Sequence, residues 1–200
     1  MRSRTATASR CASTSRSSVR VLLLVAVAFL AARPAAALTL EQVGGHFGFG
    51  YGQLLNDDPP AGSLAFGAGV DIPVLPSLRA GIDLGFDLLG SRVEERGSVS
   101  ADVEYSMFEV FGLLHWTPRD AWRLSMGPGL VHARGDLSSS GPVAFEDLAV
   151  NEAAPGGSLS VQWLMGSKSP LRVGVEAGVR TAWMESETWT VMLGRLMVHY

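Results

Sequence analysis

From residue 44 to the end, the sequence is dominated by segments in which apolar and polar residues alternate with a period of two. In the clearest segment, 78–88, one phase carries Leu, Ala, Ile, Leu, Phe and Leu, and the other carries Arg, Gly, Asp, Gly and Asp. Segments 63–72 and 171–183 repeat this pattern. A period of two indicates β-strands, because successive strand side chains point to opposite faces, whereas a helix needs apolar residues three and four positions apart. These segments are therefore predicted to be strands.

Five further segments follow the same alternation less regularly and bring the expected number of strands to eight. They are 46–53, 102–116, 122–130, 159–165 and 189–200. Segment 102–116 is irregular, because Glu109 falls in phase with the apolar residues Tyr105, Met107, Phe111 and Leu113. A bulge near Met107–Phe108 would account for the irregularity, since one extra residue changes the phase of a strand.

The links between these segments alternate in length. Segments 73–77, 117–121 and 166–170 are short and contain Pro, whereas 54–62, 89–101 and 134–157 are longer, polar and acidic; 184–188 is a short exception. Short turns at one end and long loops at the other are typical of outer-membrane barrels, whose long loops lie outside the cell. The pattern predicts an all-β fold, a single antiparallel transmembrane β-barrel of about eight strands.

The composition of the polar phase favours a membrane barrel over a soluble lipocalin-like one. A water-facing surface is rich in long charged side chains, but residues 38–200 contain a single lysine, Lys168. Gly, Ser, Asp and occasional Arg suit the interior of a small barrel, whose apolar phase then faces lipid. Three tryptophans lie near the ends of predicted strands, as in the aromatic girdles at membrane interfaces: Trp116, Trp122 and Trp183. Trp189 falls in the inward phase and does not fit this pattern.

Charges in the inward phase predict a network of paired side chains that fills the lumen. Glu176 and Arg180 share a face four residues apart and are expected to pair. The complete predicted network is Arg79, Asp83, Asp87, Arg123, Glu176, Arg180 and Arg195. Because eight strands leave room for little more than side chains, a closed plug is favoured over the alternative, a narrow gated pore.

The beginning of the chain predicts a cleaved signal peptide over residues 1–37. Five arginines and no acid in residues 1–20 precede an apolar run of twelve residues at 21–32, and Ala35–Ala37 supplies small residues for cleavage. Twelve apolar residues are too few for a membrane-spanning helix, which needs roughly 20. Residues 38–200 would then form the outer-membrane barrel domain.

Charge and cysteine content narrow the functional classes. Residues 38–200 keep all 19 acidic residues but only ten of the 16 basic ones, because six arginines lie in the first 37, so their net charge is about −9. This makes nucleic acid an unexpected partner, since phosphate contacts need clustered Lys and Arg. The single cysteine, Cys11, lies in the leader, and no cofactor or metal site is expected. Two acidic segments, 56–58 and 94–95, fall in predicted outer loops, where solvated charges are favoured over a cation site.

The C-terminal segment carries a resemblance to a known family. Tyr200 ends the sequence with Val198, Leu196, Gly194 and Met192 alternating behind it, which resembles the terminal strand of outer-membrane barrels. Residues 44–200 resemble the small eight-stranded OmpA/OmpX-type barrels. The resemblance implies a monomer in the bacterial outer membrane with a structural, adhesive or surface-interaction role. It also implies contact with membrane lipids and lipopolysaccharide, and assembly by periplasmic chaperones and the barrel-assembly machinery, for which Tyr200 would be the signal.

A lipid A-modifying enzyme and a soluble periplasmic lipocalin-like carrier are the two rival interpretations. The lipid A deacylase family uses a His-x-Ser pair. Here His46, His115 and His132 are followed two positions later by Gly, Thr and Arg, and nothing stands two positions after His199. No catalytic residue is therefore expected.

Overall fold

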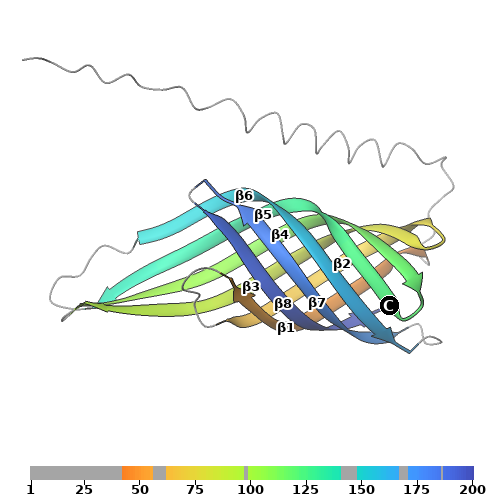
Figure 1. Ribbon diagram of the computed structural model, residues 1–200, viewed down its shortest axis with the longest axis horizontal. Coiled ribbons are helices and arrows are strands. Elements are labelled where there is room, and N and C mark those ends of the chain that lie inside the picture. The colour runs from red at the N-terminus through yellow and green to blue at the C-terminus, as the bar shows by residue number, and fades with distance from the viewer. Residues whose placement is uncertain (1–41, 56–61, 97–98, 141–147, 167–170, 186) are drawn as a thin grey trace, which may run out of the picture. The chain divides into compact units, whose positions relative to one another are not determined.

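The computed structural model describes residues 42–55, 62–96, 99–140, 148–166, 171–185 and 187–200. The predicted signal peptide and the acidic segment 56–58 lie outside these ranges. The eight strands are β1 (Gly44–Leu54), β2 (Ser63–Leu75), β3 (Leu78–Arg96), β4 (Val99–Arg119), β5 (Trp122–Ser140), β6 (Leu148–Met165), β7 (Arg172–Trp183) and β8 (Thr188–His199). Each strand pairs antiparallel with the next, and β1 pairs with β8, so the predicted eight-stranded barrel is confirmed (Figure 1). None of the described residues forms a helix long and apolar enough to cross a membrane.

Strands β3 to β6 extend much further than the alternating pattern predicts. They contain 18 to 21 residues, whereas β1, β2, β7 and β8 contain 11 to 13. The predicted loops 89–101 and 134–157 are therefore too long. Glu94 and Glu95, expected in a loop, belong to β3 and pair with Ala101 and Ser100 of β4. The pattern fails here because a strand beyond the membrane no longer needs an apolar face.

The outer surface of the barrel is apolar and the inner surface is polar along most strands, as the alternation predicts. Ile82 on β3 is 56% exposed, whereas its neighbour Asp83 is 5% exposed. The same division holds on β2, where Val70 faces outward and Asp71 is buried, and on β7, where Val175 faces outward and Glu176 is buried. A barrel that is soluble in water would have the opposite arrangement, so this exterior suits lipid.

Strand β4 departs from the prediction because both of its faces are apolar. Met107, Glu109 and Phe111 are all buried inside the barrel, while Phe108 and Val110 face outward. The predicted bulge near Met107–Phe108 is wrong, because both residues pair in continuous register with β3 and β5. The register between β3 and β4 shifts instead between Leu88 and Gly90 of β3, where Gly90 has a φ of 89°, in the left-handed region that favours glycine.

Tryptophans mark the ends of several strands on the outer surface. Trp116 and Trp122 flank the short β4–β5 turn, and Trp183 ends β7; all three are exposed. This placement agrees with rings at a membrane interface. Trp189 on β8 is buried in the lumen, as its phase indicates, and its ring meets that of Tyr105 edge-on at a centroid distance of 5.6 Å.

Candidate functional site in the lumen

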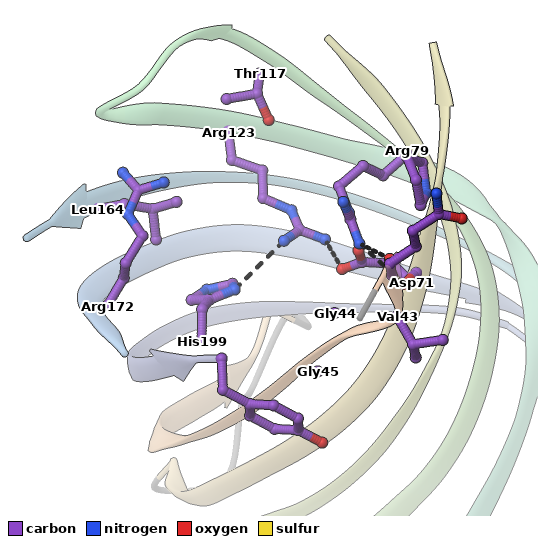
Figure 2. Close-up of a pocket in the computed structure, with 13 residues that line it drawn as sticks. Val43, Gly44, Gly45, Asp71, Arg79, Thr117, Arg123, Leu164, Arg172 and His199 are labelled. Atoms are coloured by element: carbon purple, nitrogen blue, oxygen red, sulfur yellow. Dashed lines mark hydrogen bonds and ion pairs between the residues drawn. The ribbon is translucent and has the colours of Figure 1, made fainter. Parts of the chain in front are cut away.

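The lumen near the short turns contains a cluster of charges centred on Asp71. Arg79 of β3 pairs with Asp71 Oδ1, and Arg123 Nη2 of β5 donates a hydrogen bond to Asp71 Oδ2 at 2.5 Å. Arg123 Nη1 also lies 3.3 Å from His199 Nδ1 of β8 (Figure 2). These residues come together because β2, β3, β5 and β8 all begin or end at this mouth of the barrel. We call Asp71, Arg79, Arg123 and His199 the Asp71 cluster.

His46 connects the Asp71 cluster to the next layer of the lumen. Its Nε2 lies 3.1 Å from Asp83 Oδ1, and its Nδ1 lies 3.9 Å from Asp71 Oδ2. The His46 ring also neighbours the His199 and His115 rings, at centroid distances of 5.3 and 6.0 Å. His46 therefore links the carboxylates of Asp71 and Asp83, and no single arginine among the described residues contacts both of them.

The middle of the lumen holds a second group of charges, which we call the central cluster: Asp87, Glu109, Glu176, Arg180 and Arg195. Arg180 of β7 pairs across the lumen with Glu109 of β4 and lies 3.5 Å from Asp87 of β3. Arg195 pairs with Glu176 at 2.7 Å, and Gln162 donates a longer hydrogen bond, 3.4 Å, to the same carboxylate. Charges buried this deeply are tolerated when they are paired and hydrogen-bonded.

The expected pairing of Glu176 with Arg180 is wrong, although both side chains face the lumen. Residues four positions apart on one strand lie about 13 Å apart, since each residue adds roughly 3.3 Å. Neighbours on adjacent strands are much closer, with Cβ atoms about 5 Å apart. Glu176 therefore pairs with Arg195, which is its register partner on β8, and Arg180 reaches Glu109 on the opposite wall.

An apolar cluster lies beside the central cluster, and most of its members are nearer to the long-strand end than the central-cluster residues of the same strands. Its main members come from six strands and are almost fully buried: Leu54, Leu89, Met107, Phe111, Leu113, Val131, Ala133, Ala182, Trp189 and Val191. Phe111 joins the two layers, because its ring lies 5.6 Å from the Arg180 guanidinium carbon. The alternation did not predict this cluster, because it assigns apolar residues to the lipid-facing side.

The structure places all seven predicted network residues in the lumen, with Arg79 at its mouth and half-buried. Sequence reasoning missed Asp71 and Glu109, and it assigned the histidines no partners. Both acids left a signal: Asp71 occupies the polar phase of its strand, and Glu109 is the residue that made segment 102–116 irregular. An acid in phase with lumen-facing residues predicts a buried partner of opposite charge.

A serine–histidine contact is the one arrangement in the described lumen that resembles a nucleophile and its base. His115 Nδ1 lies 2.8 Å from Ser125 Oγ. However, Ser125 is 1% exposed and His115 is fully buried, so no substrate carbonyl can reach the hydroxyl. His132, by contrast, is exposed on the outer surface. Among the described residues, no group of three or more His, Cys, Asp or Glu side chains could hold a metal ion.

Comparisons with known proteins give structural matches only. No family model and no curated protein matches the chain. Ail, the attachment invasion locus protein of Yersinia pestis, in complex with the heparin analogue sucrose octasulfate, superposes with a TM-score of 0.57 at 9% identity, covering 79% of this chain and 97% of Ail. A second Ail structure gives 0.56 at 11% identity with the same coverage. The N-terminal β-barrel domain of Pseudomonas aeruginosa OprF gives 0.49 at 9% identity, covering 80% and 98%.

At such low identity the likeness concerns the fold. It agrees with the closed eight-stranded topology. The apolar exterior of this chain, in turn, suits contact with lipid. The chain is a small eight-stranded β-barrel with the fold of outer-membrane barrels such as Ail, and its apolar exterior suits a lipid bilayer.

Proposed function

We propose that this protein is a closed, non-conducting barrel that anchors a projecting β-sheet at the cell surface for structural or adhesive interactions. The observation that carries the proposal is the apolar cluster, whose buried side chains come from six strands and occupy the lumen beside the central cluster and towards the long-strand end. An ion crossing it would lose its hydration without gaining a polar partner, which is strongly unfavourable. A narrow pore is therefore disfavoured, and the activity is expected at the surface.

The projecting sheet is formed by the long ends of β3, β4, β5 and β6. A tilted strand crosses a bilayer with roughly 9–11 residues, so strands of 18 to 21 residues exceed the membrane thickness. The connections after β2, β4 and β6 are short, so most of the excess length lies at the opposite end, where the long strands extend beyond the others (Figure 1). In outer-membrane barrels this end faces the outside of the cell.

The structural comparison favours an adhesive role over an enzymatic or a carrier role. Ail, which shares the fold, is named for attachment and invasion and was solved with a heparin analogue. A lipid A-modifying activity finds no support in the described residues, since the Ser125–His115 pair is sealed inside the lumen. The apolar exterior speaks against a soluble lipocalin-like carrier.

The proposed partners follow from the same surfaces. Membrane lipids and lipopolysaccharide would cover the apolar exterior. A monomer suffices because β1 pairs with β8, so the closed barrel leaves no unpaired strand edge. Periplasmic chaperones and the barrel-assembly machinery would deliver the chain, with Tyr200 as the assembly signal.

The proposed function is tested by shortening the projecting sheet. In the shortened variant, residues 91–104 are replaced by Asn-Gly, which joins Gly90 of β3 to its register partner Tyr105 of β4 in a two-residue hairpin. Cells displaying the full or shortened protein are compared for attachment to surfaces coated with heparin or with basement-membrane proteins. We expect attachment above that of cells without the protein, and its loss in the shortened variant. Equal membrane levels and gel mobility of unboiled samples serve as the control for folding. Attachment that is no greater than in cells without the protein, or that survives the shortening, would refute the adhesive role.

A further inference from the structure

The short-turn mouth of the barrel contains a cavity that the proposed surface role does not use. It has a volume of about 430 Å³, which is within the size range of small-molecule sites. Its charged lining residues are Asp71, Arg79, Arg123 and Arg172, joined by His199, while Val43, Pro73 and Leu164 supply apolar surface. Figure 2 shows Arg123, Arg172 and His199 reaching the cavity from β5, β7 and β8.

Positive charge exceeds negative charge in this cavity. Three guanidinium groups, those of Arg79, Arg123 and Arg172, face one side-chain carboxylate, that of Asp71. Asp71 is already bound by both Arg79 and Arg123. Arg172 contacts no carboxylate among the described residues, and its Nη2 donates to the main-chain carbonyl of Asp120. An anion would therefore complement the charge.

Several nitrogen atoms in the cavity lining have no hydrogen-bond partner among the described residues. They are Nε of Arg123, Nε of Arg172 and Nε2 of His199, all of them inaccessible to solvent. The residues Arg123 and His199 are more than nine-tenths buried. His199 lies between the two arginines, because it contacts Arg123 Nη1 and is the register partner of Arg172. These donors reach the cavity lining from three strands, and guanidinium and imidazole N–H groups are the donors that bind carboxylate and phosphate oxygens.

The backbone around the cavity is fitted to this arrangement. A Cβ on Gly44 would lie 2.9 Å from both Arg79 Nη2 and Asp71 Oδ1, so a larger residue at this position would displace that ion pair. The Gly45 amide donates to the Tyr200 carbonyl at 3.1 Å, which fixes the end of β8 and with it the adjacent His199. The cationic lining is thus held in place by pairing at the barrel seam.

We propose that this cavity binds the oxyanion group, carboxylate or phosphate, of a small soluble molecule in the periplasm, through Arg123, Arg172 and His199. The apolar surface of Val43 and Leu164 would contact the organic part of that molecule. The site opens toward the periplasm, whereas the projecting sheet lies on the opposite side of the membrane. The two proposals are therefore independent, and either can fail without the other.

The test uses the full barrel, refolded in a zwitterionic detergent and labelled with ¹⁵N, and titrated with inorganic phosphate and, separately, with succinate. Chloride at equal ionic strength supplies the baseline. We expect saturable shifts of the Arg123 and Arg172 Nε–H resonances and of the His199 ring with at least one anion. A preference for phosphate or for succinate identifies the oxyanion. Absence of saturable shifts with both anions at millimolar concentrations would overturn the proposal.

Two matched pairs of variants locate the binding. Arg172→Gln should weaken binding by about tenfold or more, whereas Arg134→Gln, which removes an exposed cation on the projecting end of β5, should not. Thr117→Glu places a competing carboxylate in the lining and should abolish binding. Thr117→Gln, whose side chain has the same size as glutamate but no charge, should retain it. If Arg172→Gln and Thr117→Glu bind as well as the unmodified protein does, the anion binds elsewhere and the assignment is wrong.

Discussion

Glu176 of β7 and Arg195 of β8 are register partners, and their side chains form an ion pair at 2.7 Å inside the lumen, each 3% exposed or less. Removing either partner alone leaves a buried charge without its counter-ion. We expect Glu176→Leu or Arg195→Leu to lower the free energy of unfolding by about 3–5 kcal/mol. The double variant should recover much of this loss, because no lone charge remains. Denaturant titration of the three variants in detergent measures both effects.

The exposed pair Arg134–Asp136 is the control for that cycle. Its side chains are 56% and 45% exposed, so breaking it should change stability by only about 0–1 kcal/mol. Single variants of Glu176 and Arg195 that fall within the same range would show that the central cluster is solvated, which contradicts a closed lumen.

Two glycines test how tightly the lumen is packed. A Cβ added at Gly67 would overlap the Arg195 guanidinium, whereas a Cβ at Gly112 would meet no atom within 4 Å. Gly67→Ala should therefore destabilise the barrel by about 1–3 kcal/mol, and Gly112→Ala should be neutral or slightly stabilising. Thermal unfolding in detergent checks the difference. Equal melting temperatures for the two variants would contradict the position of Arg195.

The apolar cluster should prevent ion conduction. In planar bilayers the unmodified barrel is expected to show no steady conductance, whereas the double variant Phe111→Ser, Trp189→Ser should leak, because it opens space and adds hydroxyl groups within the apolar cluster. The control is Trp183→Ser, which removes a tryptophan from the outer surface and should remain silent. Channels recorded from the unmodified protein would contradict closure.

The apolar exterior makes folding depend on a lipid-like phase. Refolding of residues 38–200 should give a β-rich circular-dichroism spectrum in detergent or vesicles, and aggregation in plain buffer. Ile82→Arg on the outer face should reduce folding into vesicles by up to about 2–4 kcal/mol, depending on its depth. A monomeric, folded protein in plain buffer would overturn the membrane assignment.

Tyr200 contributes main-chain hydrogen bonds to the barrel, and its ring is the proposed assembly signal. A pair of variants can separate these two roles. Its main chain exchanges hydrogen bonds with Gly45 at 3.0 and 3.1 Å, and its ring is exposed. Tyr200→Ala keeps those bonds and removes only the ring. Both this variant and the deletion of Tyr200 should reduce the amount of barrel in the outer membrane, and the deletion should also cost about 1–3 kcal/mol of stability. Normal membrane levels of Tyr200→Ala would mean that the ring is not an assembly signal.

The membrane-spanning part of the fold was predictable because lipid imposes a strict rule on every second residue. Strands β2, β3 and β7 obey this rule, and their phases were correct. The strand at 102–116 was predicted correctly, but the bulge proposed within it was wrong, since the inner face of β4 packs into the apolar cluster around Phe111, where the rule gives no information. The extension of β3 through residues 89–96 was not predicted, for a related reason. Outside the bilayer a strand needs no apolar face, and hydrogen bonds to β4 are enough to maintain it.

Partners inside the lumen depend on register, which a single sequence does not specify. Nothing in the spacing of Glu176, Arg180 and Arg195 indicates that the first pairs with the third. Glu109 and Arg180 are likewise brought together only by closure of the barrel, since they lie on β4 and β7. Asp71 was visible in the polar phase, but one of its two arginines, Arg123, comes from β5, which does not pair with β2 and reaches Asp71 only across the lumen.

The pairing of β1 with β8 has a consequence for the order of folding. Hairpins between successive strands can form locally, but His46 and His199 are register partners across almost the whole barrel domain. Contacts between residues so distant in sequence form slowly, because the loop-closure entropy must be lost before they stabilise anything. Until β8 docks, an incomplete sheet carries two open edges and the charges of the lumen remain in water. Closure of this seam is therefore expected to be the rate-limiting and committing step, at which water is expelled and the buried ion pairs form together.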